Sequence, residues 1–285
     1  RLFVEDPVTW FRDDVAPLPT PKGSIRIHSA AEIGRFLDAA ERYCDPGRPF
    51  VVRRKKNGKV EQYEQRRSTE PAPLVRWALL LACTGIRRGE AERLRWADCD
   101  LDSGNITVFA TKTKRPRTIR LTGDPAGDTS PGFVEVLRTW RRSRPHDVFV
   151  MGDGTAAQRK AWVARKKRSG EDVVEGPADA AALPAPATFP ARAWARVAES
   201  ADVPDLSPQS LRATWESALA AIGFPSAITA FMAGHSVRVA EAHYREFAIG
   251  RLPGKTLDEA LGLSPYLRRE ATSTPLRIVR ENEAG

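Results

Sequence analysis

Apolar residues recur at helical spacing in two separated segments of the chain. In the first, Ser29 and Glu32 form a capping box, and the apolar stripe after it predicts a helix to about Tyr43. The second segment, 133–142, has one apolar side and predicts an amphipathic helix. The two stripes consist of Ile33, Phe36 and Leu37 in the first helix and Phe133, Val136, Leu137 and Trp140 in the second.

Between these helices lies a more continuously apolar segment. Leu74 to Cys83 predicts a buried helix, which Gly85 ends, and a second helical piece is expected at 88–94. β-Forming residues predict strands at 105–110, 118–121 and 148–151, and a basic stretch joins the first two. Asn57-Gly58 predicts a hairpin turn, because both residues tolerate positive φ.

The last third of the chain is predicted to be helical. Helices are expected at 190–200, 208–223, 226–233 and 236–247, with serines at three of their starts. The segment 152–188 changes from basic to acidic to Ala- and Pro-rich and is interpreted as a loop. Beyond residue 251, a weak helix at 257–261 precedes polar residues.

The charge of the chain indicates an anionic binding partner. The 285 residues carry a formal net charge of +9, and the sequence pI is about 9.8. Basic clusters at 53–59, 112–120, 138–144 and 159–168 are spread over several segments, so folding could gather them around a phosphate backbone. The three cysteines form no C-x-x-C pair, which indicates neither a zinc site nor a disulfide framework and favours a reduced, cytoplasmic setting. No apolar run is long enough to span a membrane.

Four residues stand where they could carry chemistry. Arg87 follows the helix-ending Gly85, Arg212 lies near a helix N-terminus, His235 lies at a tight junction between helices, and Tyr244 lies on an amphipathic helix. Each also has an ordinary structural explanation: a surface arginine after a glycine, a solvated polar residue, a structural histidine and a core tyrosine.

The order of these residues resembles the signature of the tyrosine recombinase (phage integrase) family. Thr-Gly-Ile-Arg at 84–87 with Glu90 is followed by the basic turn, then Leu-Arg-Ala-Thr at 211–214, Gly-His-Ser at 234–236 and Tyr244. The spacings of 23 positions from Arg212 to His235 and nine from His235 to Tyr244 agree with the family. The resemblance runs from about residue 27 to residue 247. It implies a mixed α+β fold, mostly helical with a small antiparallel β-sheet.

The resemblance also implies a mechanism without metal or cofactor. Arg87, Arg212 and His235 would hold the phosphodiester, and Tyr244 would attack it to form a 3′-phosphotyrosine. A lysine on the β-turn would protonate the leaving 5′-oxygen, and Lys112 aligns better with that role than Lys114. Glu90 is expected to support the site. Further DNA contacts are expected from Lys114, Arg115 and Arg117 on the turn and from Lys166, Lys167 and Arg168 in the 152–188 loop.

Two features depart from the family pattern. Gln209 stands where the family usually has histidine; glutamine can donate a hydrogen bond but cannot exchange a proton at neutral pH. Residues 1–28 resemble the linker that follows the family's N-terminal core-binding domain, so the 285 residues are expected not to include that domain. The expected organisation is therefore a linker at 1–28, a catalytic domain at 29–250 and a C-terminal tail at 251–285, with the tail as a hypothetical docking segment between protomers.

The sequence leaves three functional classes open. An active recombinase would work on double-stranded DNA as a homotetramer on two duplexes, with the isolated domain a monomer. A recombinase-fold DNA-binding protein that has lost catalysis is the alternative that Gln209 motivates. A type IB topoisomerase would share the chemistry but relax arbitrary supercoiled DNA.

Overall fold

The computed structural model describes residues 26–44, 50–56, 59–65, 73–109, 116–124, 126–154, 185–237 and 255–272. For the hairpin strands β1 (Phe50–Lys56) and β2 (Lys59–Gln65) it describes the backbone, which pairs in antiparallel register from Phe50 opposite Gln65 to Lys56 opposite Lys59. The predicted hairpin around residues 57–58 is therefore confirmed.

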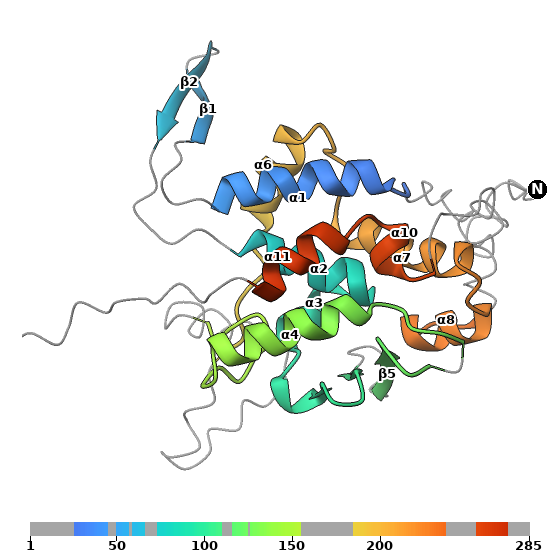
Figure 1. Cartoon of the computed structure of the whole chain (residues 1–285). Helices are drawn as coiled ribbons and strands as arrows, with labels where there is room; N and C mark the ends of the chain where they lie inside the picture. The colour runs from blue at the N-terminus through green and yellow to red at the C-terminus, as the bar shows by residue number, and fades with distance from the viewer. Residues whose placement is uncertain are drawn as a thin grey trace, which may run out of the picture.

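The body of the molecule is a set of helices packed around one buried helix, with a small sheet at its lower edge in Figure 1. The central helix α2 (Leu74–Thr84) has ten buried residues in eleven, as its nearly unbroken apolar sequence predicts. It packs against α1 (Ala30–Cys44) on one side and α7 (Pro208–Ala221) on another. Helix α6 (Ala191–Ser200) covers α1.

Local signals in the sequence set several helix ends. The Ser29–Glu32 capping box forms at the start of α1, where the Glu32 carboxylate accepts the backbone N–H of Ser29 at 2.8 Å. Ser207 caps α7 by accepting the N–H of Ser210 at 3.1 Å. Gly85 ends α2 in the left-handed conformation, with φ +60°.

The sheet has three antiparallel strands, in the order β3-β4-β5. The two longer strands, β4 (Asn105–Phe109) and β5 (Pro116–Arg120), agree with the prediction. The predicted strand at 148–151 is wrong: Phe149 makes one isolated bridge to Arg95, and the third strand is the short β3 (Cys99–Asp100). The 148–151 run is apolar because Phe149, Val150 and Met151 are buried, and a short apolar run does not distinguish a strand from a buried turn.

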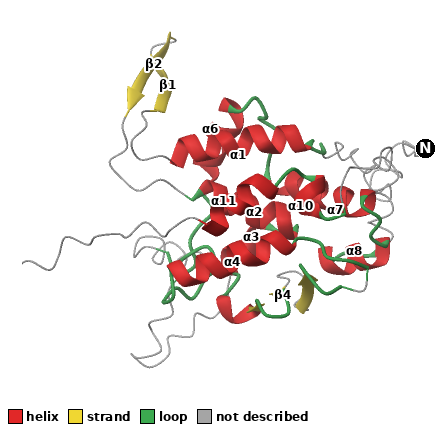
Figure 2. Ribbon diagram, in the orientation of Figure 1, coloured by secondary structure: helices red, strands yellow, loops and turns green. Residues whose placement is uncertain are grey.

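The remaining helices lie on the side of α2 that is toward the sheet in Figure 2. Between the α2 turn and the sheet are the short helix α3 (Arg88–Arg93) and the 3₁₀ turn η1 (Trp96–Asp98). Helix α4 (Pro131–Ser143) follows the sheet, and α8 (Ser226–Ala233) contacts β5. No helix of the described residues combines the length and the apolar character needed to cross a membrane.

The C-terminal helices α10 (Leu257–Ala260) and α11 (Ser264–Thr272) belong to the core of the same chain. Figure 1 shows α11, in red, beside α4 and below α1. The Tyr266 hydroxyl lies 2.8 Å from an Asp38 oxygen, and the buried Asp258 carboxylate accepts the N–H of Gly132 at 2.8 Å at the start of α4. Part of the expected tail is thus built into the domain, and the docking hypothesis concerns residues 273–285, which lie outside the described residues.

Candidate active site

Arg87 stands at the turn between two helices. Gly85 ends α2 by donating its N–H to the Leu81 carbonyl at 2.9 Å, and Arg87 then takes the N-cap position of α3. The Glu90 carboxylate holds this turn from within: it accepts the Arg87 backbone N–H at 2.8 Å and lies 3.2 Å from Arg87 Nη1. The Arg87 side chain remains 43% exposed, and its contact with Glu90 uses one of its guanidinium nitrogens.

The same Glu90 carboxylate binds a second, buried arginine from the sheet. Arg117 of β5 donates from Nη1 and Nη2 to the two carboxylate oxygens, at 3.0 and 2.7 Å. Burial alone would raise the pKa of Glu90, but the hydrogen bonds from Arg117 and from the Arg87 N–H, with both positive charges, hold it below its ordinary value. Arg117 was expected to contact DNA; the structure instead places its side chain in the interior, 4% exposed, with its donors on protein acceptors.

Arg212 projects from the first turns of α7 into the space beside the Arg87 turn. Its Nη1 donates to the Gly85 carbonyl at 2.7 Å, its Nη2 donates to the Ala233 carbonyl, and its Nε lies 3.1 Å from a Glu216 oxygen. Burial lowers the pKa of Arg212 to about 10; Glu216 opposes this shift, while Arg87 and Arg117 add to it. The guanidinium therefore stays charged at neutral pH.

His235 follows directly on the end of α8. Gly234 ends that helix with φ +74°, and His235 then places its ring against α7. Its Nε2 lies 3.1 Å from the second oxygen of Glu216, and its Nδ1 lies 3.1 Å from the Ser236 carbonyl. A buried carboxylate of α7 therefore joins the second arginine of the cluster to the histidine.

The last carbonyls of α8 bring the two buried arginines together. The Met232 carbonyl accepts from Arg117 Nε at 2.7 Å, and the next carbonyl accepts from Arg212. These are end carbonyls of a helix, which lack helical partners and carry its partial negative charge, so cations are favoured there. A Cβ on Gly234 would lie 2.9 Å from Arg117 Cδ, which leaves no room for a side chain.

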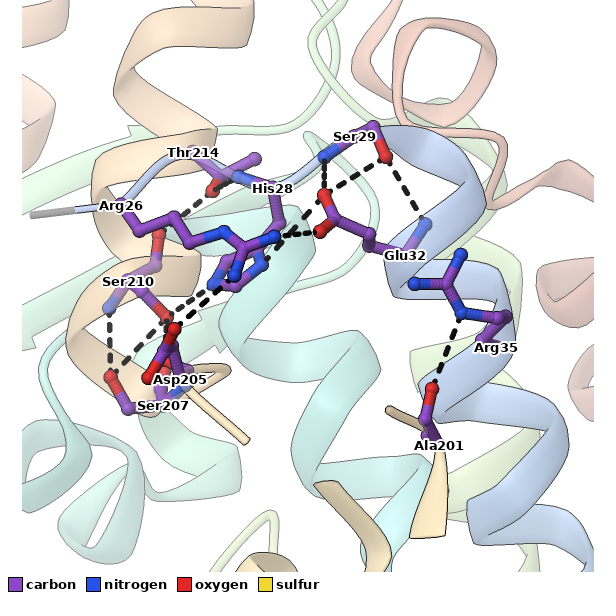
Figure 3. A network of polar contacts seen from close by, with 10 residues as sticks. All are labelled: Arg26, His28, Ser29, Glu32, Arg35, Ala201, Asp205, Ser207, Ser210 and Thr214. Atoms are coloured by element: carbon purple, nitrogen blue, oxygen red, sulfur yellow. Dashed lines mark hydrogen bonds and ion pairs between the residues drawn. The ribbon is translucent and has the colours of Figure 1, made fainter. Parts of the chain in front are cut away.

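The first turn of α7 is itself anchored to the chain entering α1. His28, which is buried, lies with Nε2 3.0 Å from the Ser210 hydroxyl and donates its backbone N–H to Thr214 Oγ1 at 3.0 Å (Figure 3). Arg26 spans from Glu32 to Asp205 beside it. Burial lowers the pKa of His28, so the ring is neutral at neutral pH. This network fixes the helix that carries Arg212.

The structure describes some of the predicted site residues and not others. The structure brings Arg87, Glu90, Arg212 and His235 into one cluster, and it puts Gln209 exposed in the first turn of α7. Glu216 was not singled out from the sequence, although its position four residues after Arg212 was a visible signal for a helical ion pair. Outside the described residues lie Lys112, Lys114, Arg115, Lys166, Lys167, Arg168 and Tyr244. In the part of the chain that is described, no group of three or more His, Cys, Asp or Glu side chains is arranged to hold a metal ion.

Comparison with known proteins gives one broad match and several partial ones. The sequence model of the phage integrase family matches residues 62–248. An uncharacterized protein of Sinorhizobium fredii (strain NBRC 101917 / NGR234), y4gA, is 32% identical over 95 residues, which are 33% of this chain and 41% of that protein. The chain thus aligns with less than half the length of that curated relative.

Solved structures resemble the chain at low sequence identity. The XerA recombinase matches with a TM-score of 0.46 and 16% identity, over 86% of this chain and 65% of that one. A lambda integrase dimer bound to a core site matches with a TM-score of 0.45 and 14% identity, over 81% of this chain and 62% of that one.

Proposed function

The chain belongs to the phage integrase family, and we propose that it is a site-specific tyrosine recombinase that cuts and rejoins DNA through a 3′-phosphotyrosine at Tyr244. The observation that supports this most directly is the convergence of Arg87, Arg212 and His235, which come from three separate segments of the chain. A lone arginine or histidine would have an ordinary structural explanation, but two guanidiniums and an imidazole brought together from separate segments suit a phosphodiester.

Arg87 and Arg212 keep N–H groups that the described protein contacts do not use. A guanidinium carries five N–H groups, and the contacts described for Arg212 use three of its nitrogens once each, which leaves two N–H groups. Arg87 is more exposed and already fixed at its backbone by Glu90. Two guanidiniums can then bind the nonbridging oxygens and stabilise the additional negative charge of the transition state. Removing either should slow cleavage about 10²- to 10³-fold, by analogy with a lost oxyanion donor.

The proposed chemistry assigns the remaining steps to residues outside the described ranges. Tyr244 attacks phosphorus as the phenolate, having released its proton to solvent, and forms the new P–O bond. The bond to the 5′-oxygen breaks, and Lys112, or Lys114 in its place, protonates that oxygen. The phosphotyrosine keeps the energy of the phosphodiester, so rejoining needs no ATP. Lys114 and Arg115 on the turn, and the basic residues 166–168, are proposed to contact DNA.

Partners and setting complete the proposal. We place the protein in the cytoplasm on chromosomal or mobile-element DNA, acting as a homotetramer on two duplexes and as a monomer when free. Docking between protomers is assigned to residues 273–285, because helices α10 and α11 are packed into their own domain. Removing 273–285 should then abolish assembly and spare cleavage.

The test is formation of a covalent adduct. Sequences enriched by the chain from a random duplex library are rebuilt as a set of nicked duplexes tiled across the enriched site, and adducts are resolved on a denaturing gel. We expect an adduct from the wild type and from Tyr43→Phe, a matched change on α1, and none from Tyr244→Phe. An adduct that survives Tyr244→Phe would refute the assignment.

A second function keeps some support from Gln209. Its amide cannot exchange a proton, so a chain that binds the enriched duplex without forming any adduct would be a DNA-binding protein on the recombinase fold. Relaxation of an arbitrary supercoiled plasmid would instead indicate a topoisomerase.

A further inference from the structure

Glu216 lies at the centre of the cluster and has no role in the chemistry described above. It sits one helical turn after Arg212 on α7 and is 6% exposed. One of its carboxylate oxygens lies 3.1 Å from Arg212 Nε, and the other lies 3.1 Å from His235 Nε2. Each oxygen therefore serves a different member of the phosphate-binding set.

These contacts constrain the histidine ring. A carboxylate can only accept hydrogen bonds, so the contact with Glu216 places a hydrogen on Nε2. The other nitrogen faces the Ser236 carbonyl, which is also an acceptor. Replacing the carboxylate with an amide would remove this control, because one amide oxygen can serve only one of the two donors and the NH₂ group would face the other.

Glu216 also sets the charge of the cluster. The guanidiniums of Arg87, Arg117 and Arg212 face the carboxylates of Glu90 and Glu216, so three positive charges against two negative ones leave an excess of one. That excess matches the single charge of a phosphodiester. Without the Glu216 charge the excess becomes two, which strengthens attraction for any phosphate but no longer holds the donors in place.

We propose that Glu216 is a positioning residue for phosphoryl transfer, which holds the Arg212 guanidinium and the His235 ring together as one unit at the phosphate site. This inference rests on the proposed function. It differs from a purely structural role in one measurable way: loss of the carboxylate should slow the chemical step without weakening DNA binding.

The variants are Glu216→Gln and a matched control, Glu92→Gln. Glu92 of α3 is 8% exposed, accepts the backbone N–H of Phe189 at 3.2 Å and lies 4.0 Å from Arg88 Nε, so its described partners are not members of the cluster. On the nicked duplexes described above, we expect Glu216→Gln to lower the single-turnover rate of adduct formation about 10²-fold, the size of effect that misplaced reacting groups produce. Its affinity for the same duplex should equal or exceed that of the wild type, and Glu92→Gln should leave the rate unchanged.

A second measurement is independent of activity. Correlation spectra of the histidine ring nitrogens, with the signals of His235 assigned through His235→Asn, report which nitrogen carries hydrogen. We expect the His235 ring signals to shift in Glu216→Gln and to stay in place in Glu92→Gln.

The outcomes separate the two proposals. If the wild type forms an adduct and Glu216→Gln forms it at the same rate, the inference is wrong and the proposed function stands. If Glu216→Gln loses rate and DNA affinity together, Glu216 is structural and the inference is again wrong. If the wild type forms no adduct, the proposed function fails and the catalytic part of the inference fails with it; unchanged His235 signals in Glu216→Gln would overturn the contact itself.

Discussion

Replacing Gly85 with alanine should destabilise the chain and impair the site together. Gly85 has φ +60°, and an added Cβ would lie 2.3 Å from Cε3 and 2.4 Å from Cδ2 of the Trp215 ring. The ring is fully buried, and its Nε1 donates to the Cys83 carbonyl at 3.2 Å. It cannot move aside without losing that hydrogen bond and disturbing the packing of α2 against α7.

The size of the effect follows from two separate costs. A non-glycine residue in the left-handed region costs about 1–2 kcal/mol, and overpacking a close-packed core costs about 1–3 kcal/mol. The free energy of unfolding should therefore fall by roughly 2–5 kcal/mol. Gly123 offers a matched control, because it has φ +71° and nothing within 4 Å of an added Cβ. Gly123→Ala should cost only the first term, about 1–2 kcal/mol.

Urea unfolding followed by far-UV circular dichroism measures both variants, and tryptophan fluorescence is avoided because Trp215 is itself the contact. A loss in Gly85→Ala no larger than that in Gly123→Ala would refute the placement of the ring against the turn. The Gly85 carbonyl also accepts from Arg212 at 2.7 Å, so at a temperature where both variants are folded, Gly85→Ala alone should slow adduct formation.

Two further predictions concern buried polar groups elsewhere in the structure. Glu90→Gln leaves Arg117 buried without its carboxylate and should cost about 3–5 kcal/mol at neutral pH. The pKa of Glu90 in the folded protein lies below its ordinary 4.5. The difference in unfolding free energy between the wild type and Glu90→Gln should therefore be constant above about pH 4.5 and shrink as pH falls through the folded pKa. Urea unfolding across acid pH measures this difference, and a difference that does not change with pH would contradict the prediction. Tyr266→Phe removes a hydroxyl held by Asp38 and should cost about 1–2 kcal/mol. Burial and Asp38 raise the pKa of Tyr266 to about 12, so this difference in unfolding free energy should be present below about pH 10 and vanish as pH rises toward 12; equal stability of the two proteins at neutral pH would show that the hydroxyl contributes nothing.

Local signals in the sequence were enough to predict most of the helical frame. Ser29 with Glu32, Ser207 with Pro208, and Gly85 act through backbone groups within a few residues, so their effect can be predicted without knowing the fold. Helix α11 was missed because its segment, Ser264–Thr272, has only Tyr266 and Leu267 as buried apolar residues. Such a helix is stabilised by its packing on α4 and by the contacts of Tyr266 and Arg269 with α1, and those contacts have no local signature.

The sequence predicted the hydrogen-bond donors of the candidate site but not the acceptors that hold them. Arg87, Arg212 and His235 could be identified because a family signature orders them along the chain. The acceptors that fix Arg212 include the carbonyls of Gly85 and Ala233, and a backbone carbonyl has no residue type by which a sequence could reveal it. Arg117 was assigned to DNA for the same reason: a basic turn suggests phosphate contacts, while burial against Glu90 depends on the fold.

The three arginines of the cluster differ in side-chain exposure, and this difference distinguishes an arginine that stabilises the fold from those that can bind a substrate. Side-chain exposure rises from 4% for Arg117 to 10% for Arg212 and 43% for Arg87. A fully buried cation must be neutralised by the protein, as Glu90 neutralises Arg117, and such a pair has little capacity left for a substrate. A largely exposed arginine keeps its N–H groups for a substrate but is poorly oriented unless its backbone is fixed. Glu90 fixes the backbone of Arg87. The exposure of Arg212 lies between these limits. This arginine therefore needs a carboxylate of its own, Glu216, which balances its charge and sets the direction of its donors.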